Sequence, residues 1–266
     1  VVVPVSIEGR ISASDFKNYI SPKTKVVAVT QASNVLNIEL DIKYIVDLAH
    51  AVGAKVVVDA AQFVVHKKVD VKDLGCDFLA FSAHKMFGST GVGALFVKQD
   101  LLNEMEPAQF GGGMVFEVDV NGTEPLQTIH KLEAGTPAIA QAIGFGAAVD
   151  FIEKNIDFTQ LKKHEVSLCR KLVEGLRKIK GINILGVDNY SDGSGYLVSF
   201  VVDNIHPHDV AAYLNQHKIC VRAGHHCAQP LHKKMGLDAS VRVSISVYND
   251  FNDIEAILEA LRRLEL

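Results

Sequence analysis

Hydrophobic runs and amphipathic segments alternate along the first hundred residues. Residues 25–30 (KVVAVT) and 55–58 (KVVV) are continuous Val-rich runs, which are typical of strands buried on both faces. Residues 41–52 carry apolar side chains at helical spacing, and Gly53 supplies a stop signal. Two further strands are predicted at residues 78–82 and 93–97. This strand–helix–strand order predicts an α/β fold with a mostly parallel sheet.

The pattern changes after Gly135, where helices dominate and strands are short. The predicted elements are helices at 138–153, 161–179, 208–217 and 253–264, with strands at 196–202 and near Cys220. We therefore expect a large α/β domain over residues 1–148 and a smaller C-terminal α+β domain over residues 149–266.

Composition and charge exclude several classes of protein. The 266 residues are 48% hydrophobic, which rules out a disordered chain. The formal net charge of -4 gives no basic surface for nucleic acid or an anionic membrane. No apolar stretch approaches the roughly 20 residues of a membrane span, and no secretory signal is recognisable. Four scattered cysteines form no disulfide framework, so we expect a cytoplasmic protein.

The first candidate for chemistry is an Asp and a Lys that each follow a predicted strand. Asp59 ends one buried strand, where open α/β sheets bind ligands, and Lys85 follows another. A Lys that forms a Schiff base, together with an Asp on the pyridine nitrogen, is typical of pyridoxal phosphate sites. Ser82 and His84 are suitable donors to the cofactor phosphate. The residue pattern alone also allows a solvated Lys and an Asp that caps a helix.

The second candidate is the loop RAGHHCAQP at residues 222–230. Its thiol, Cys227, is preceded by an Arg and two imidazoles and followed by a Pro. This setting favours a reactive nucleophile. A zinc site is the alternative, and its possible ligands are His225, His226, Cys227 and His232. Adjacent residues rarely bind one ion, and no CxxC or HxxxH pair is present, so we expect no metal.

The remaining cysteines and one strand Arg complete the candidates. Cys76, Cys169 and Cys220 lie in or beside apolar segments and are expected to be buried and inert. Arg242 lies within the strand-like sequence VRVSIS. If its side chain points inward it needs an anionic partner such as a substrate carboxylate, whereas a solvent-facing Arg is the alternative.

Five segments together resemble one enzyme family. They are VVVDAAQ, FSAHKMFGSTGVGALFVK, GGGM, LEAGTPAIAQAIGFGAAVDF and VRAGHHCAQPL. These closely resemble the cysteine desulfurases of the SufS/CsdA type, in the class V aminotransferase-like branch of the fold-type I pyridoxal phosphate enzymes. The resemblance runs from Val1 to Leu266. The Lys motif and the short Cys loop are its most specific parts, because the IscS/NifS desulfurases carry their Cys on a longer loop.

The resemblance implies a role for each residue that would hold the cofactor. Lys85 would form the Schiff base with pyridoxal phosphate and then transfer a proton. Asp59 would hold the pyridine nitrogen and Gln62 the phenolic oxygen. Ser82 and His84 would bind the phosphate.

The resemblance also implies residues for substrate binding, dimer contacts and sulfur transfer. Asn34 matches a residue near the cofactor and substrate, and Thr136 one that reaches the phosphate of the neighbouring subunit, which implies a homodimer. Arg242 would bind the substrate carboxylate, with Arg222 as a second active-site Arg. Cys227 would take the sulfur of L-cysteine as a persulfide and release alanine.

The implied function is the supply of persulfide sulfur for iron–sulfur cluster assembly. The expected partner is a SufE- or SufU-like sulfur acceptor. Two alternatives remain: a selenocysteine lyase acting on L-selenocysteine, or a truncated non-catalytic paralogue or fragment that serves as a binding partner.

The sequence departs from the family at its front end. It begins at Val1 rather than Met, and only 24 residues precede the strand at Lys25. The family's ring-stacking His and its Gly/Thr phosphate loop both lie upstream of that strand. The family pattern GTxNP is replaced by NIELD at residues 37–41. We therefore expect the chain to lack roughly the N-terminal third of a family member.

Overall fold

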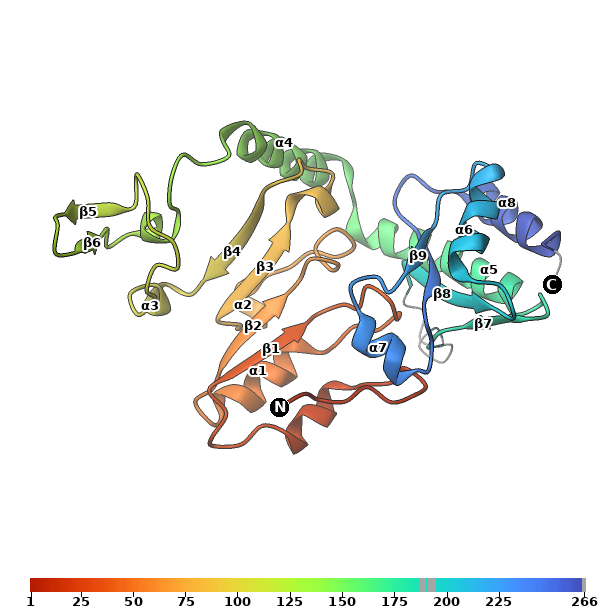
Figure 1. The fold of residues 1–266 in the computed structure, drawn as a ribbon, viewed down its shortest axis with the longest axis horizontal. Helices are drawn as coiled ribbons and strands as arrows, with labels where there is room; N and C mark the ends of the chain where they lie inside the picture. The colour runs from red at the N-terminus through yellow and green to blue at the C-terminus, as the bar shows by residue number, and fades with distance from the viewer. Residues whose placement is uncertain (187–189, 191–194, 265–266) are drawn as a thin grey trace.

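Two β-sheets, a small hairpin and the surrounding helices make up the computed structural model, which describes residues 1–186, 190 and 195–264 (Figure 1). The first sheet precedes residue 100 and the second follows residue 180. Between them run two long helices, α4 (Ile139–Asn155) and α5 (Phe158–Leu176).

The first sheet has the strand order β1-β2-β3-β4. Its strands are β1 (Val26–Thr30), β2 (Lys55–Asp59), β3 (Phe78–Ser82) and β4 (Gly93–Val97). The first three run parallel, and β4 pairs antiparallel with β3. The predicted parallel-rich sheet is therefore confirmed, and the carboxyl ends of β1, β2 and β3 meet at one edge.

Helix α1 (Ile42–His50) covers one face of this sheet. It begins after Asp41, whose carboxylate accepts a hydrogen bond of 3.1 Å from the backbone N–H of Tyr44 and so caps the helix. Four side chains of α1 are buried against the inward valines of β1 and β2. These helix residues are Ile42, Ile45, Val46 and Ala49. Each buried aliphatic side chain of this kind contributes roughly 1.5–3 kcal/mol, so this contact fixes the helix on the sheet.

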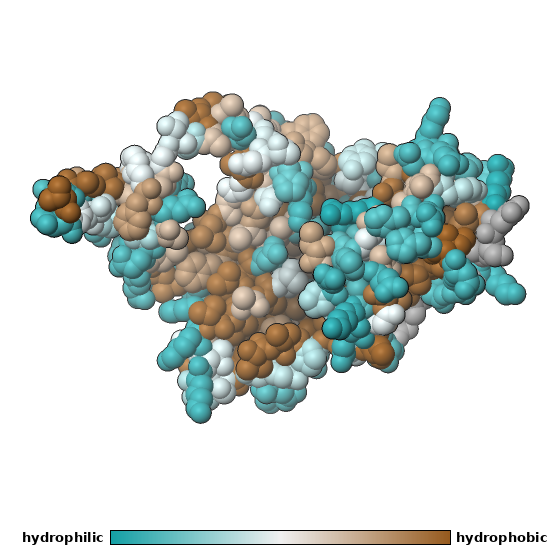
Figure 2. Space-filling view, in the orientation of Figure 1, coloured by the Kyte–Doolittle hydropathy of each residue, from teal (hydrophilic) through white to brown (hydrophobic). Residues whose placement is uncertain are grey.

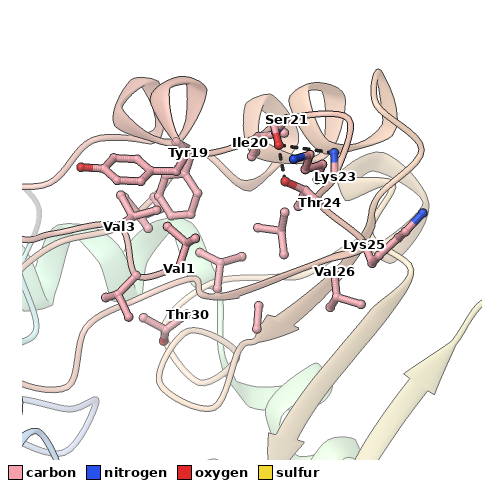
Figure 3. A pocket seen from close by; sticks show the side chains of 16 residues that line it. Val1, Val3, Tyr19, Ile20, Ser21, Lys23, Thr24, Lys25, Val26 and Thr30 are labelled. Atoms are coloured by element: carbon pink, nitrogen blue, oxygen red, sulfur yellow. Dashed lines mark hydrogen bonds between the residues drawn. The ribbon is translucent and has the colours of Figure 1, made fainter.

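The opposite face of β1 is open, which corrects the expectation of a strand buried on both faces. Val27 and Val29 are buried, but Val26, the first residue of β1, is 57% exposed. This open face lines a groove of about 680 Å³ together with the side chains of Val1, Val3 and Tyr19 (Figure 3). A continuous apolar run predicts a strand, but here only one of its faces packs against the buried core of α1.

Several short elements lie outside the two four-stranded sheets. They are the 3-10 helices Ala13–Asn18 (η1), Ala83–Met86 (η2) and Ile129–Leu132 (η3), the short helices Val71–Leu74 (α2) and Gln99–Leu102 (α3), and the strands Val115–Val118 (β5) and Thr123–Pro125 (β6). The β5–β6 hairpin projects away from the rest of the molecule (Figure 1), and the space-filling view shows hydrophobic side chains near its tip (Figure 2). Phe116, in β5, is 70% exposed. The hydrophobic pattern of the sequence does not predict this hairpin.

The second sheet is antiparallel, with the strand order β7-β8-β10-β9. Its strands are β7 (Ile182–Ile184), β8 (Leu197–Val202), β9 (Arg222–Gly224) and β10 (Ser240–Ser244). Helices α5, α6 (Pro207–Gln216) and α8 (Phe251–Arg262) share one hydrophobic core with it, around Leu172 and Phe200. Antiparallel strands with helices packed on them form the expected α+β arrangement.

The division of the chain after residue 148 stays a prediction. That point lies inside α4, which runs on to Asn155. The predicted second domain also includes residues 187–189, 191–194 and 265–266, which lie outside the described residues. In the part of the chain that the structure describes, every helix is too short or too polar to cross a bilayer.

Candidate active site

Asp59 lies at the carboxyl edge of the first sheet, as the last residue of β2. Its backbone carbonyl accepts a hydrogen bond of 2.9 Å from the backbone N–H of Gln31, in the segment that follows β1. Its side-chain Oδ1 accepts another of 2.9 Å from the backbone N–H of Ala61. Gln62 follows in the same turn and is half-buried. The turn therefore presents a carboxylate and an amide side by side at the sheet edge.

Lys85 follows the neighbouring strand. The register pairs Asp59 with Ala80 of β3. Strand β3 ends two residues after Ala80, at Ser82. Helix η2 then carries His84, which is exposed, and Lys85, which is half-buried. Phe87 closes this turn in the left-handed region, at φ 61°.

The residues at this edge fit a pyridoxal phosphate site. Within residues 1–186, 190 and 195–264, no ion pair joins Asp59 or Lys85 to another side chain. A carboxylate without a cationic partner suits a protonated pyridine nitrogen, and an uncommitted amine suits a Schiff base. The hydroxyl of Ser82 and the imidazole of His84 supply donors for a phosphate.

The Cys loop joins β9 to α7 (Gln229–Lys234). Its two central residues, His226 and Cys227, both adopt the left-handed backbone conformation, with φ 53° and 61°. The side chain of His226 is buried, whereas Cys227 is exposed. The loop therefore turns its thiol to the surface while anchoring the preceding imidazole inside the fold.

A positive charge lies next to this thiol. Arg242 on β10 is the cross-strand partner of Arg222 on β9. Burial lowers the pKa of Arg242, the charge of Arg222 lowers it further, and the Cys227 thiol raises it. Among the described residues neither Arg forms an ion pair with a carboxylate. Two unpaired guanidinium groups on adjacent strands are suited to an anionic ligand.

Asn34 connects the first sheet to the Cys loop. It lies in the segment after β1, and its side-chain amide donates a hydrogen bond to the backbone carbonyl of His226. Its own carbonyl accepts a hydrogen bond of 3.0 Å from Nη1 of Arg242. The same segment contacts Asp59 through Gln31. One stretch of chain thus touches both the Asp59 turn and the Cys loop.

Thr136 lies apart from the other candidates. It is exposed, in the segment between η3 and α4, and no hydrogen bond within the described part of the chain joins it to the residues above. The predicted contact of Thr136 with a neighbouring subunit stays a prediction.

The other three thiols differ in exposure. Cys76 and Cys169 are buried as expected, and burial raises the pKa of both, that of Cys169 to about 12. Cys220, in contrast, is exposed. The expectation for Cys220 was wrong because it lies between α6 and β9 rather than within a strand.

The two buried imidazoles near the Cys loop form hydrogen bonds to the protein. Nε2 of His226 lies 3.1 Å from the hydroxyl of Ser240, and Nε2 of His232 lies 2.9 Å from the same hydroxyl. Burial, followed by the charge of Arg242, lowers the pKa of His226 to about 4. Among the described residues no group of three or more His, Cys, Asp or Glu side chains could hold a metal ion. The sequence pattern presents these imidazoles only as neighbours of the thiol or as possible metal ligands, and it contains no signal that points to Ser240.

The chain also matches known proteins in sequence and in overall fold. Residues 1–257 match the family Aminotransferase class-V. A protein of Halalkalibacterium halodurans named "Probable cysteine desulfurase" is 42% identical over 261 residues, which are 98% of this chain and 63% of that protein. The structure of the present chain resembles the cysteine desulfurase CsdA of Escherichia coli, with a TM-score of 0.88 and 35% identity over 94% of this chain and 61% of that chain. It also resembles the apo cysteine desulfurase of Thermococcus onnurineus NA1, with a TM-score of 0.92 and 37% identity over 99% of this chain and 65% of that one.

These matches bear on the fold, the cofactor and the extent of the chain. They confirm the expected incomplete fold-type I architecture and pyridoxal phosphate as the cofactor. The chain spans less than two thirds of the length of the relatives that it matches.

Proposed function

The chain belongs to the aminotransferase class-V family, and on that premise we propose that the protein of which it forms part is a pyridoxal phosphate-dependent cysteine desulfurase. The enzyme would convert L-cysteine to L-alanine and leave the sulfur on Cys227. The observation that carries this proposal is the pair of hydrogen bonds by which Asn34 contacts both His226 and Arg242. It holds Arg242, a group suited to a carboxylate, next to the loop that exposes the Cys227 thiol.

The residues at the edge of the first sheet would hold the cofactor. Lys85 would bind it covalently, Asp59 would pair with its pyridine nitrogen and Gln62 would contact its phenolic oxygen. Ser82 and His84 would bind its phosphate, and Thr136 that of the partner subunit in a homodimer. When bound, pyridoxal phosphate supplies an electron sink for bonds at the α-carbon of the substrate. Lys85 would then move the proton at that carbon.

Arg242 would orient the substrate. Its guanidinium would bind the carboxylate of L-cysteine, with Arg222 adding positive charge and Asn34 supporting both the Arg and the Cys loop. The substrate would thus be held between the Asp59–Lys85 edge and the thiol.

Cys227 would accept the sulfur. Its thiolate would attack the sulfur of the substrate, so that an S–S bond forms and the C–S bond breaks, with the electron pair of that bond remaining on the carbon. Protonation of that carbon yields L-alanine. One L-cysteine and one thiol therefore give one L-alanine and one persulfide, without an added oxidant or reductant.

The finer assignments are part of the same proposal. The persulfide would pass to a SufE- or SufU-like acceptor for iron–sulfur cluster assembly in the cytoplasm. A lyase that acts on L-selenocysteine uses the same residue types, and a non-catalytic binding role is the remaining alternative.

The test is to incubate the full-length protein, loaded with pyridoxal phosphate, with L-cysteine or L-selenocysteine and to quantify alanine. The proposal expects alanine from L-cysteine, with sulfide released in equal amount when a thiol reductant is added. Alanine from L-selenocysteine alone would identify a selenocysteine lyase, and no alanine from either would favour the binding role.

A further inference from the structure

The backbone of the Cys loop is held in an uncommon conformation. His226 and Cys227 are consecutive non-glycine residues with positive φ, and such residues persist only where the surrounding structure enforces them. The loop follows Gly224, the last residue of β9, whose cross-strand partner is Ser240 on β10. Ser240 is fully buried beneath the loop.

Three buried side chains form a directional chain of hydrogen bonds under this loop. Nδ1 of His232 lies 3.1 Å from the carbonyl of Ala228, so this nitrogen carries the proton and donates. In the neutral ring, Nε2 of His232 is then an acceptor, and the Ser240 hydroxyl at 2.9 Å donates to it.

The direction of the next bond follows from this. Nε2 of His226 lies 3.1 Å from both the carbonyl and the hydroxyl oxygen of Ser240. A carbonyl only accepts, so Nε2 of His226 is the donor to both. The chain therefore runs from His226 through Ser240 to His232, and the single hydrogen on Nε2 of His226 is shared between the two oxygens of Ser240.

The other side of the loop is tied to the substrate-binding residues. The carbonyl of His226 accepts the Asn34 amide, and Asn34 in turn accepts from Arg242. His226 is therefore held at two points, through its ring by Ser240 and through its backbone carbonyl by Asn34. Cys227 is the next residue, so its position relative to Arg242 depends on both attachments.

We propose that Ser240 and His232 are positioning residues that act through His226 to hold the Cys227 thiol beside Arg242. This inference builds on the proposed function in taking Cys227 as the sulfur acceptor, but it concerns only where the thiol is held.

The test measures the reaction of Cys227 in the full-length protein with two alkylating agents, the anionic iodoacetate and the neutral iodoacetamide, followed by peptide mass spectrometry. The ratio of the two rates reports positive charge near the thiol. In Ser240→Ala the ratio at Cys227 should fall by about threefold or more, because the thiol moves away from the guanidinium. Ser240→Thr keeps the hydroxyl and should retain the ratio.

A matched pair at His232 gives a second reading. His232→Gln keeps an acceptor for the Ser240 hydroxyl and should retain the ratio, whereas His232→Asn is too short to do so and should lower it. The exposed Cys220 provides an internal reference, since its ratio should not change. Ser167→Ala, which removes a serine hydroxyl that bonds within its own helix, is the control variant.

An unchanged ratio at Cys227 in folded Ser240→Ala and His232→Asn would overturn the proposal, even if both variants melt at lower temperature. If Ser240→Ala does not fold, the His232 pair decides. The alkylation requires neither turnover nor L-cysteine. A failure of the desulfurase assignment would therefore show in the alanine assay and leave the alkylation result standing.

Discussion

At the scale of single residues, the four thiols of this chain differ in environment rather than in chemistry. Cys169 lies in the core of the second sheet, where burial raises its pKa to about 12. Cys227 is exposed and lies beside a guanidinium. Since the thiolate is the nucleophile and positive charge favours it, this environment supports the proposal that Cys227 accepts the sulfur.

Replacing Arg242 tests the substrate carboxylate site. Arg242→Ala should raise the KM for L-cysteine by about tenfold or more, because a hydrogen bond to a charged group contributes roughly 1.5–3 kcal/mol. Arg242→Lys keeps the charge but loses the bidentate geometry, so its KM for L-cysteine should lie between those of the wild type and Arg242→Ala. Steady-state kinetics of alanine formation provide the measurement, and an unchanged KM in Arg242→Ala would contradict the assignment.

Replacing Lys85 tests the cofactor attachment. Lys85→Ala should abolish covalent retention of pyridoxal phosphate, because no other amine occupies its place after β3. The measurement is mass spectrometry of the protein after borohydride reduction. Lys68→Ala, at an exposed Lys, is the control and should retain the covalent label. A label that persists in Lys85→Ala would refute the role of Lys85.

At the scale of elements, one buried carboxylate ties α1, β2 and β4 together. Asp77 is 3% exposed and its Oδ2 accepts hydrogen bonds of 2.7 Å from the backbone N–H of Val56 and 2.8 Å from His50. Lys98, directly after β4, lies 3.2 Å from Oδ1. Burial acts to raise the pKa of Asp77, but the hydrogen bonds from His50, Val56 and Lys98 outweigh it and hold the pKa below its ordinary value of 3.8.

This carboxylate predicts a loss of stability in acid. A carboxyl with a lowered pKa in the folded state stabilises the fold above its unfolded pKa, and the contribution is lost as the pH falls through the folded value. The free energy of unfolding, measured by urea denaturation, should therefore decrease below about pH 4. Asp77→Asn should be less stable at neutral pH and show a weaker dependence on pH in that window. An equal slope in both proteins would contradict the role of Asp77.

The element pattern was largely predictable from the sequence, with ends shifted by a few residues. Strands 78–82 and 93–97 were predicted at their observed bounds, because their apolar runs are flanked by Gly, Ser and Asp. The β5–β6 hairpin was missed because its side chains are mostly exposed and show no hydrophobic alternation toward a core. Cys220 was misplaced because an apolar neighbourhood in sequence does not reveal which residues the fold leaves uncovered.

At the scale of the whole molecule, the candidate site lies where the two sheets meet. The Asn34 contacts with His226 and Arg242 join residues 192 and 208 positions apart. Nearby, the Ser199 hydroxyl of β8 donates to the carbonyl of Val35 at 2.7 Å. Farther along the junction, buried His66 lies 2.7 Å from Glu165 of α5. Such contacts depend on the tertiary fold, so spacing along the sequence singles out candidate residues but does not reveal the hydrogen bonds of Ser240 with His226 and His232.

The most direct test of the account is to locate the transferred sulfur. The full-length protein with bound pyridoxal phosphate is treated with L-cysteine, its thiols are trapped, and its peptides are examined by mass spectrometry. We expect the peptide that contains Cys227 to gain the mass of one sulfur atom, while peptides with Cys76, Cys169 and Cys220 do not. Cys227→Ala should bind the cofactor and form no persulfide. Sulfur found on another cysteine, or persulfide formed by Cys227→Ala, would contradict the account.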